Sequence, residues 1–404
     1  MHSDSVGLAD VEAARARLPE TQGRIGSITK VVTALCVLVL RDEGRLDLDD
    51  PLARYVPQAT QAGVTLRRAL AHLSGLQREA PGIVWQTLEM PERDALLGDL
   101  DGVPQVVPAG SWWHYSNLAF ALLGEVVERV SGMPYARFAD ERVLRPLGMA
   151  HTGWEPRPDA ARGYDVDPWS DAVWLARDVP LRALAACGEL WSTAGDLCRL
   201  AAFMCEPDDR ILARSTVDEM HAPQAIADPE TWKIGFGLGP MLLRRGDRIL
   251  AGHTGGMPGQ IAVVAYLRSA RTGAAALVNA GSGLDVNAFG CELVEAALEH
   301  MPPEPTPWTP GAEPPAEIAP LVGHWWSEGT EYVLVWRAGE LRAQNTAGVD
   351  ARFAPDGTDR WRTVRGRERG EALVVVRAAD GSVERLEWAS YALTRAPRPP
   401  WAAG

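Results

Sequence analysis

The chain has 404 residues and a net charge of −13 at pH 7, with 53 acidic side chains against 40 lysines and arginines. This acidic balance lacks the positive field that nucleic acids and anionic membrane surfaces attract, so neither is expected as a partner. Five cysteines without a C-x-x-C pair favour buried thiols in a reducing compartment over a disulfide framework or a zinc site.

Residues 1–20 contain acidic side chains and no apolar stretch, so no secretory signal is visible. The longest apolar run, residues 31–40, is too short to span a bilayer. We therefore expect a cytoplasmic protein, an expectation that an upstream extension of the chain would change.

The first informative segment is residues 24–34, R-I-G-S-I-T-K-V-V-T-A, which pairs a candidate nucleophile with a candidate base. The nucleophile is Ser27, and a serine hydroxyl needs a proton acceptor within hydrogen-bond reach to react at neutral pH. If Ser27 opens a helix, Lys30 lies one turn away on the same face. The chain holds only two lysines, and lysine, unlike arginine, can give up its proton. This rarity argues against a chance S-x-x-K match and favours Lys30 as the base.

Two helices are predicted next. Residues 64–76 form a short amphipathic pattern closed by a glycine, and His72 within it is more typical of a packed core residue than of a catalytic one. Residues 118–130 form a stronger helix, which the triplet Y-S-N precedes. In this triplet the Tyr115 phenol can relay a proton, and the Asn117 amide can hold a substrate carbonyl.

The periodicity then changes from helical to that of strands. Residues 153–179 have no clear period and predict a long surface loop, and Thr193 with Asp196 predicts a capped helix start. Four strand patterns and a closing helix follow at residues 235–243, 248–251, 260–268, 273–279 and 285–299. Helices grouped apart from consecutive strands predict an α+β domain with one antiparallel sheet.

A third polar motif, H-T-G, lies among these strands. His253, Thr254 and Gly255 follow an apolar strand pattern and lead into Gly256, and such small residues let a substrate approach the backbone closely. A second H-T-G at residues 151–153 follows a helix end and enters the irregular loop. We therefore expect the later histidine at the site, and not the earlier one.

Prolines crowd residues 302–315 and predict a semi-rigid linker, residues 301–316, between two domains. The first domain, residues 1–300, holds the three motifs. The second, residues 317–404, shows only short strand patterns divided by glycine turns, and predicts a small antiparallel β-barrel or sandwich without a catalytic constellation of its own.

The order S-x-x-K, Y-x-N, H-T-G resembles the serine β-lactamase and penicillin-binding-protein superfamily, especially its class C-like branch of family VIII esterases, D-aminopeptidases and related acyl-transfer enzymes. The resemblance covers residues 6–300. It implies an α+β, β-lactamase/transpeptidase-like fold, in which an antiparallel sheet packs against a helical subdomain. It implies no metal and no organic cofactor.

Carried over motif by motif, the resemblance implies a role for each residue. Ser27 would be the acylated nucleophile, Lys30 its base partner, and Tyr115 the group that passes the proton to the leaving group and later activates water. The substrate-binding and oxyanion residues would come from the second and third motifs: Asn117, His253, Thr254, Gly255 and Gly256. The backbone N–H groups of Ser27 and of the last of these would form the oxyanion hole.

One departure from the family bears on the substrate. β-Lactamases and transpeptidases have lysine in the third motif, whose fixed charge helps to hold a carboxylate, whereas His253 is largely neutral at pH 7. This difference favours esters, amides or carrier-bound thioesters and predicts weak penicillin hydrolysis. Similar H-T-G enzymes include esterases and penicillin-binding-protein-type thioesterases that release and cyclise peptides, some with a lipocalin-like C-terminal domain.

Three functions remain open on the sequence. The leading hypothesis is a serine hydrolase that forms an acyl-enzyme with a carboxylic ester or small amide, its acyl substrate being a small molecule or a peptide. The runner-up is an acyltransferase or peptide cyclase/thioesterase, in which an amine or alcohol replaces water. The third is an inactive ligand-sensing or scaffolding protein on the same fold, which the intact Ser27, Lys30 and Tyr115 disfavour.

The N-terminal part is short for the family. Only 26 residues precede Ser27, whereas family members begin with a helix and two strands, of which the first pairs with the last strand of the sheet. Residues 274–279 would then form an exposed apolar edge, which favours aggregation or strand exchange. We expect either a true start upstream, or a strand borrowed from the C-terminal domain or from a second copy in a homo-oligomer.

Overall fold

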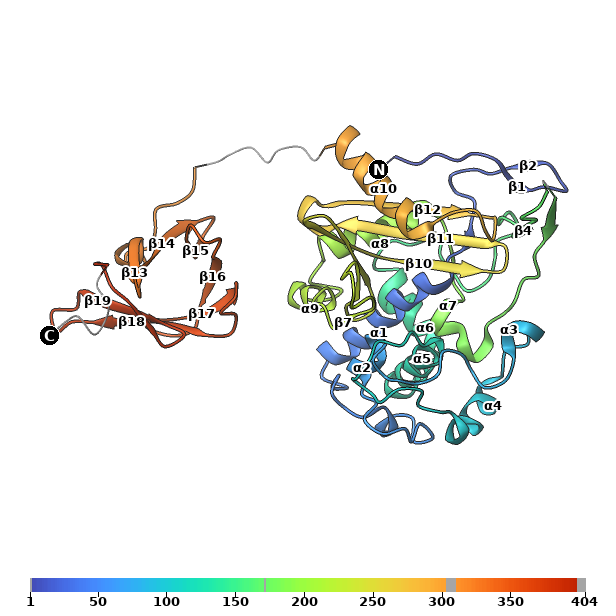
Figure 1. Ribbon diagram of the computed structural model, residues 1–404, viewed down its shortest axis with the longest axis horizontal. Coiled ribbons are helices and arrows are strands. Elements are labelled where there is room, and N and C mark those ends of the chain that lie inside the picture. The colour runs from blue at the N-terminus through green and yellow to red at the C-terminus, as the bar shows by residue number, and fades with distance from the viewer. Residues whose placement is uncertain (1, 171, 303–309, 398–404) are drawn as a thin grey trace. The chain divides into compact units, whose positions relative to one another are not determined.

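The computed structural model describes residues 2–170, 172–302 and 310–397. Two units make up the chain, residues 1–304 and 305–404 (Figure 1). Each has its own hydrophobic core. The predicted linker falls partly on residues 303–309, which lie outside the described residues. No helix among the described residues has the length and apolarity needed to cross a membrane.

The larger unit is built around a six-stranded antiparallel sheet with the order β12-β11-β10-β9-β8-β7. Its strands are β7 (Ala225–Ile226), β8 (Ile234–Phe236), β9 (Met241–Arg245), β10 (Arg248–Met257), β11 (Gln260–Leu267) and β12 (Thr272–Val278). Each strand lies beside the next one in sequence, so short connections join them as hairpins. β12 ends the order, and no described strand pairs with its outer edge.

Two strands differ from the sequence prediction. Residues 235–243 form two strands instead of one, because Gly239 adopts φ +102° and Pro240 has no N–H for the ladder. β10 continues through the H-T-G motif to Met257 instead of ending before it. The third motif therefore lies on an inner strand of the sheet.

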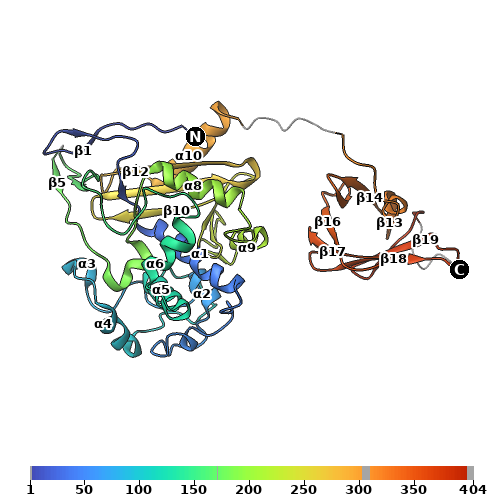
Figure 2. The ribbon, with the colours of Figure 1, turned by 180° about the vertical axis from the view of Figure 1, so that it is seen from behind.

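Helices cover both faces of this sheet (Figure 1 and Figure 2). On β11, Val263 packs in a cluster with α10 (Val286–His300), whereas Val264 and Tyr266 belong to the core shared with the helical region. This alternation is the period of two expected for a strand that is buried on both faces. α8 (Ala194–Cys205) lies against the second face.

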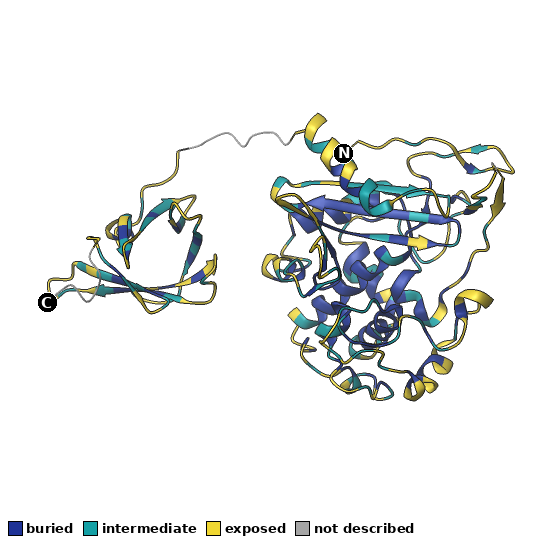
Figure 3. Ribbon diagram, viewed as in Figure 1, coloured by how far each residue is buried: buried dark blue, intermediate teal, exposed yellow. Residues whose placement is uncertain are grey.

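The helical region is centred on α1 (Thr29–Asp42), whose residues 29–40 are all buried (Figure 3). It packs against α5 (Asn117–Ser131) and α7 (Ala185–Gly188). A helix without a solvent-facing side is a fixed support for the residues at its N-terminus. One 3-10 turn, η1 (Gly26–Ile28), immediately precedes α1, so the predicted helix start at Ser27 is a tighter turn that leads into the helix.

The remaining elements of the larger unit are short. The helices are α2 (Leu66–Leu70), α3 (Val84–Thr87), α4 (Arg93–Gly98), α6 (Tyr135–Ala139) and α9 (Arg214–Met220). The 3-10 and π turns are η2 (Leu52–Arg54), η3 (Leu100–Gly102), η4 (Asp140–Leu144), η5 (Arg182–Leu184) and η6 (Arg268–Ala270). Three strand pairs complete it: β1 (Leu8–Asp10) with β2 (Arg15–Ala16), β3 (Gly23–Arg24) with β6 (Trp191–Ser192), and β4 (Tyr164–Val166) with β5 (Val173–Leu175).

These short elements correct two predictions and confirm a third. The helix predicted for residues 64–76 ends at Leu70, because His72 adopts a left-handed φ of +57° that no α-helix accommodates. The predicted loop 153–179 contains the β4–β5 hairpin. The predicted cap of α8 is present, since the Thr193 hydroxyl accepts a hydrogen bond from the Asp196 N–H at 3.2 Å.

The smaller unit is an eight-stranded antiparallel sheet in which each strand pairs with the next. A 3-10 turn, η7 (Ala319–Leu321), precedes the strands β13 (Gly323–Ser327), β14 (Thr330–Arg337), β15 (Glu340–Gln344), β16 (Asp350–Pro355), β17 (Arg360–Arg365), β18 (Ala372–Arg377), β19 (Val383–Trp388) and β20 (Tyr391–Leu393). A bridge between Trp326 and Thr394 brings the first strand to the end of the last, so the sheet curls into a nearly closed barrel. Between the predicted barrel and sandwich, the barrel is correct.

Candidate active site

Ser27 and Lys30 meet at the junction of η1 and α1. Lys30 Nζ lies 3.0 Å from Ser27 Oγ and donates a second hydrogen bond to the backbone carbonyl of Cys187 at 2.7 Å. The Lys30 side chain is fully buried, so these two contacts fix where its nitrogen lies. The predicted pair is therefore assembled, with the Cys187 carbonyl as an anchor that the sequence analysis did not foresee.

β10 lies directly against η1, the turn that carries Ser27, with no room for side chains between the two backbones. A Cβ on Gly255 would come within 1.8 Å of the Ile25 carbonyl oxygen, and a Cβ on Gly26 would lie 2.7 Å from the Gly256 nitrogen. Gly26 also adopts φ +49°. Glycine is thus required on both sides of this contact. As a result, the Gly256 backbone borders the same pocket as Ser27.

Tyr115 lies next to this pair. Its ring centroid is 5.0 Å from Lys30 Nζ and 4.8 Å from the guanidinium carbon of Arg78. No described residue hydrogen-bonds to its hydroxyl, although Tyr115 lines the Ser27 pocket. Hydrogen bonds of a proton relay often tighten only when a substrate binds. The arrangement places a phenol beside Lys30 and in the same pocket as Ser27.

Asn117, the first residue of α5, is held by a carboxylate. Its Nδ2 donates to both oxygens of Glu79, at 2.8 and 3.0 Å, while its buried Oδ1 has no partner among the described residues. Glu79 also lies 3.3 Å from Arg78, and all three residues line the pocket. The amide donor that the sequence analysis assigned to the substrate is thus engaged by Glu79.

His253 on β10 is buried and uncharged at neutral pH. Burial, and then the nearby charge of Lys30, lower the pKa of His253 to about 3. Its Nδ1 donates to the Thr254 carbonyl at 2.6 Å. The earlier H-T-G is elsewhere, since the His151 N–H binds Asp196 and its ring contacts Arg157. His253, and not His151, borders the pocket.

The Ser27 pocket has a volume of about 780 Å³ and is lined mainly by residues of the predicted motifs, β10 and the 227–241 region. Its large apolar and aromatic side chains are Trp85, Trp113, Tyr115, Ile234, Phe236, Met241, Met257 and Ile261. Its charged side chains are Arg78, Glu79 and Asp228. A cleft that combines aromatic and aliphatic side chains with convergent polar groups is typical of a small-molecule site.

A buried arginine lies shortly before η1, the turn that carries Ser27. Arg24, whose side chain is 2% exposed, donates to Asp178 at 2.5 Å, to the Val179 carbonyl at 2.7 Å and to Glu189 at 2.8 Å. These partners flank the segment that carries the Cys187 carbonyl. Arg24 therefore ties the segment that anchors Lys30 to the strand that leads into Ser27.

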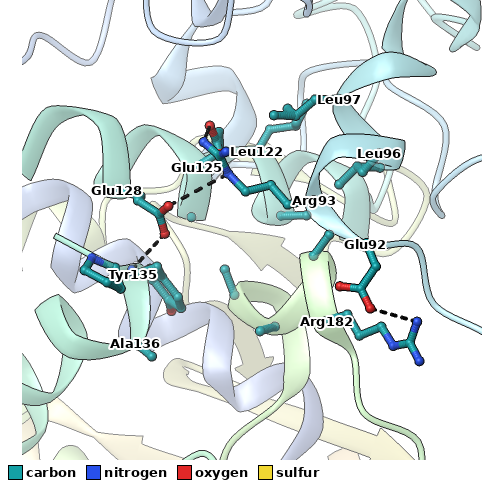
Figure 4. Close-up of a pocket in the computed structure, with 16 residues that line it drawn as sticks. Glu92, Arg93, Leu96, Leu97, Leu122, Glu125, Glu128, Tyr135, Ala136 and Arg182 are labelled. Atoms are coloured by element: carbon teal, nitrogen blue, oxygen red, sulfur yellow. Dashed lines mark hydrogen bonds and ion pairs between the residues drawn. The ribbon is translucent and has the colours of Figure 1, made fainter. Parts of the chain in front are cut away.

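A second hollow, of about 280 Å³, lies among α4, α5 and α7 (Figure 4). Its charged side chains pair with each other: Arg93 with Glu125 at 2.5 Å, and Arg182 with Glu92 at 2.9 Å. Among the described residues that line it there is no serine, cysteine, histidine or lysine. The Ser27 pocket, in contrast, brings together residues of all three predicted motifs.

Sequence reasoning missed Glu79, Arg24 and the Cys187 carbonyl. Glu79 and Arg24 meet their partners only through the tertiary fold, and a backbone carbonyl has no sequence signature at all. The sequence did hold one signal for Arg24, which precedes an apolar stretch. A charged residue that becomes buried with such a stretch needs a partner.

The β-lactamase family model matches residues 1–298. The chain belongs to this family. The resemblance drawn from the three motifs and the predicted α+β fold of β-lactamase/transpeptidase type are thereby confirmed. Residues 314–395 match a second model, a domain of unknown function.

Two curated members of the family are similar over part of their length. The D-alanyl-D-alanine-carboxypeptidase/endopeptidase AmpH of Escherichia coli (strain K12) is 34% identical over 189 residues, which are 44% of this chain and 47% of AmpH. Esterase EstB of Burkholderia gladioli is 37% identical over 196 residues, 43% of this chain and 50% of EstB. The chain thus spans about half the length of the curated relatives that it matches.

The chain is also similar to solved structures. A D-stereospecific amidohydrolase from Streptomyces sp. superposes with a TM-score of 0.60 at 26% identity, over 70% of this chain and 87% of that one. The structure of SurE superposes with a TM-score of 0.58 at 26% identity, over 97% of this chain and 91% of that one. The second match includes residues of both units.

Proposed function

We propose that the protein is a serine hydrolase that forms an acyl-enzyme on Ser27 and acts on carboxylic esters or small amides. The observation that carries this proposal is the 3.0 Å contact between Lys30 Nζ and Ser27 Oγ, made by a buried lysine that the Cys187 carbonyl holds in place. A serine hydroxyl becomes an effective nucleophile when a proton acceptor lies at this distance. Among family members, one relative is named as an esterase and one as a carboxypeptidase/endopeptidase.

In the proposed reaction, Ser27 Oγ attacks the substrate carbonyl carbon while Lys30 takes the hydroxyl proton. The oxyanion accepts hydrogen bonds from the backbone N–H groups of Ser27 and Gly256. Tyr115 passes a proton to the leaving group, so the bond to the alcohol or amine breaks and the Ser27 ester remains. Water then attacks this ester, and the Lys30–Tyr115 pair takes a proton from the water and passes it to Ser27 Oγ, so the acid leaves and the serine hydroxyl is restored.

The pocket favours acyl groups with an apolar body and no carboxylate beside the scissile bond. The neutral His253 supplies no positive charge where the family's third motif has lysine. Aromatic side chains such as Trp113 and Phe236 instead offer apolar surface. We therefore expect uncharged esters and amides to react faster than penicillins.

The experiment that tests the function uses a fluorophosphonate probe followed by peptide mass spectrometry of the full chain. An adduct on Ser27 is expected, and its absence would support the sensing or scaffolding alternative instead. Incubation with an activated ester, with and without an added amine, then separates hydrolysis from transfer. Free acid as the only product in both cases supports the hydrolase, whereas an amide product would establish the acyltransferase.

A further inference from the structure

One residue, His72, contacts three consecutive residues around Tyr115. The His72 carbonyl accepts a hydrogen bond from the His114 N–H at 2.8 Å, and His72 Nδ1 accepts one from the Ser116 N–H at 3.1 Å. Between these two bonds the imidazole stacks on the Tyr115 ring, with centroids 4.2 Å apart and an interplanar angle of 25°. The backbone on both sides of Tyr115 and the ring itself are thus held by the same residue.

The conformation of His72 is one that the surroundings must impose. The residue is fully buried and adopts φ +57°, in the left-handed region that residues with a Cβ seldom occupy. Such conformations persist where the neighbouring structure over-determines them, and they concentrate at functional sites. Here the turn after α2 takes the imidazole off the helix and sets it beside Tyr115.

The contact to Ser116 requires a neutral imidazole. Nδ1 accepts a hydrogen bond from the Ser116 N–H, so the ring hydrogen is on Nε2, which has no partner among the described residues. Burial, followed by the charge of Lys30, holds the pKa of His72 well below its ordinary value, so the acceptor persists at neutral pH. His72 is absent from the pocket lining and does not reach a substrate.

We propose that His72 is the positioning residue of the Tyr115 phenol, a role that rests on the proposed acyl-enzyme function. The stack fixes the plane of the phenol ring, and the two backbone bonds fix the direction from which it leaves the chain. A histidine that only filled space would be replaceable by any side chain of similar volume. A positioning histidine requires both its ring and its acceptor nitrogen.

Two substitutions separate these contributions in the full chain. His72→Asn tolerates a left-handed φ and keeps a short acceptor, but it removes the stack. His72→Phe keeps a ring but leaves the Ser116 N–H without a partner. With p-nitrophenyl acetate as the substrate, we expect each variant to lower kcat about 100-fold, because a misplaced catalytic group costs that much, while KM changes less than about twofold.

A double-mutant cycle with Tyr115→Phe distinguishes positioning from packing. If His72 acts through the phenol, His72→Asn should change kcat less than about threefold once the phenol is gone. Equal losses of kcat in both backgrounds would overturn the proposal. A His72→Phe variant with the kcat of the unaltered chain would also overturn it.

The matched control is His221→Asn. His221 is a second buried histidine, whose ring bonds the Val217 carbonyl and the Tyr266 hydroxyl at 2.7 and 2.9 Å, away from the described site. This variant should lose thermal stability without a change in kcat. A drop in its kcat like that of His72→Asn would show that lost stability alone explains the effect, and so would contradict the proposal.

A readout independent of activity is the NMR signal of Tyr115 in protein labelled with ¹³C at the tyrosine rings, assigned by its loss in Tyr115→Phe. It should shift in His72→Asn and stay in place in His221→Asn, and an unmoved signal in His72→Asn refutes the positioning role.

An unaltered chain that never forms the Ser27 adduct refutes the acyl-enzyme function, and with it any role of His72 in that function. An active chain with an additive cycle refutes the His72 proposal alone.

Discussion

The contact between Ser27 and Lys30 limits what can replace either side chain. Ser27→Ala removes the attacking oxygen and should abolish acylation. Lys30→Arg keeps the positive charge but cannot take a proton, so we expect the acylation rate to fall about 10³-fold. The rate of fluorophosphonate labelling, followed by mass spectrometry, measures both effects.

Lys233→Arg is the matched control for the lysine substitution. Lys233 is the other lysine of the chain, and it is exposed. Its replacement should leave the labelling rate unchanged. An active Lys30→Arg enzyme would remove the base role proposed for Lys30.

His253 sets a second prediction, which concerns substrate preference. Because His253 is neutral at pH 7, the unaltered chain should hydrolyse nitrocefin slowly compared with p-nitrophenyl acetate. His253→Lys restores the cation of the family's third motif and should raise the ratio of kcat/KM for nitrocefin to that for the ester. Efficient nitrocefin turnover by the unaltered chain would contradict this assignment.

The site residues divide into those that a sequence can reveal and those that it cannot. Ser27, Lys30 and His253 could be proposed from the sequence because short motifs mark them by residue type and spacing. Glu79 was not, because its partner Asn117 lies on another element and the pairing is formed only by the fold. His72 was assigned to a packed core, and its burial is confirmed, but its contact with Tyr115 has no signature in the sequence.

The close packing of β10 on η1 predicts different outcomes for two adjacent glycines. Gly255→Ala would force a methyl group against the Ile25 carbonyl, 1.8 Å from the new Cβ, and should lower the free energy of unfolding by about 1–3 kcal/mol. Gly256→Ala meets no atom within 4 Å and should leave stability nearly unchanged. Thermal unfolding of the two variants makes the comparison, and equal melting temperatures would show that the two backbones can separate at little cost.

The outer edge of β12, unpaired among the described strands, predicts that the chain self-associates. This strand reads T-G-A-A-A-L-V, without a charged residue or a proline to block pairing, and no described strand covers its edge. We expect the recombinant chain 1–404 to self-associate at micromolar concentration. Sedimentation velocity over a range of concentrations tests this, and a well-behaved monomer with full esterase activity would refute it.

Buried neutral histidines predict how stability varies with pH across the whole larger unit. Burial lowers the pKa of His253 to about 3 and that of His221 to about 4, and it lowers that of His72 as well. Below pH 6.5 the unfolded chain therefore binds more protons than the folded one, so stability falls as the pH drops from 6.5 towards these folded values. Each histidine contributes about 1.4 kcal/mol per pH unit in this window.

Calorimetry of the full chain between pH 5 and pH 7 measures this effect. The transition of the larger unit should move to lower temperature at pH 5. The smaller unit is an internal control, because its one histidine, His324, is exposed. His221→Gln should reduce the pH dependence of the larger unit, and an unchanged dependence would contradict the linkage.

At the scale of the whole molecule, the proline-rich segment predicted a division into two units, and periodicity predicted an α+β class for the first and an antiparallel barrel or sandwich for the second. Periodicity could not predict that a strand continues through polar or small residues. β10 runs through His253 and Thr254, whose side chains are not apolar, because inner-strand pairing and not hydrophobic alternation keeps it extended. The β4–β5 hairpin was missed for a related reason, since its residues 173–175 are exposed and carry no core-facing pattern.

The anchoring of Lys30 by the carbonyl of Cys187 has a consequence for how the chain can vary. Every amino acid has a backbone carbonyl oxygen, so residue 187 can be substituted while Lys30 keeps its hydrogen bond. Its limits are steric, because Cys187 is buried and the neighbouring Gly188 packs near Gly26. In a saturation scan of the acylation reaction, position 187 would tolerate small side chains and position 30 would tolerate none.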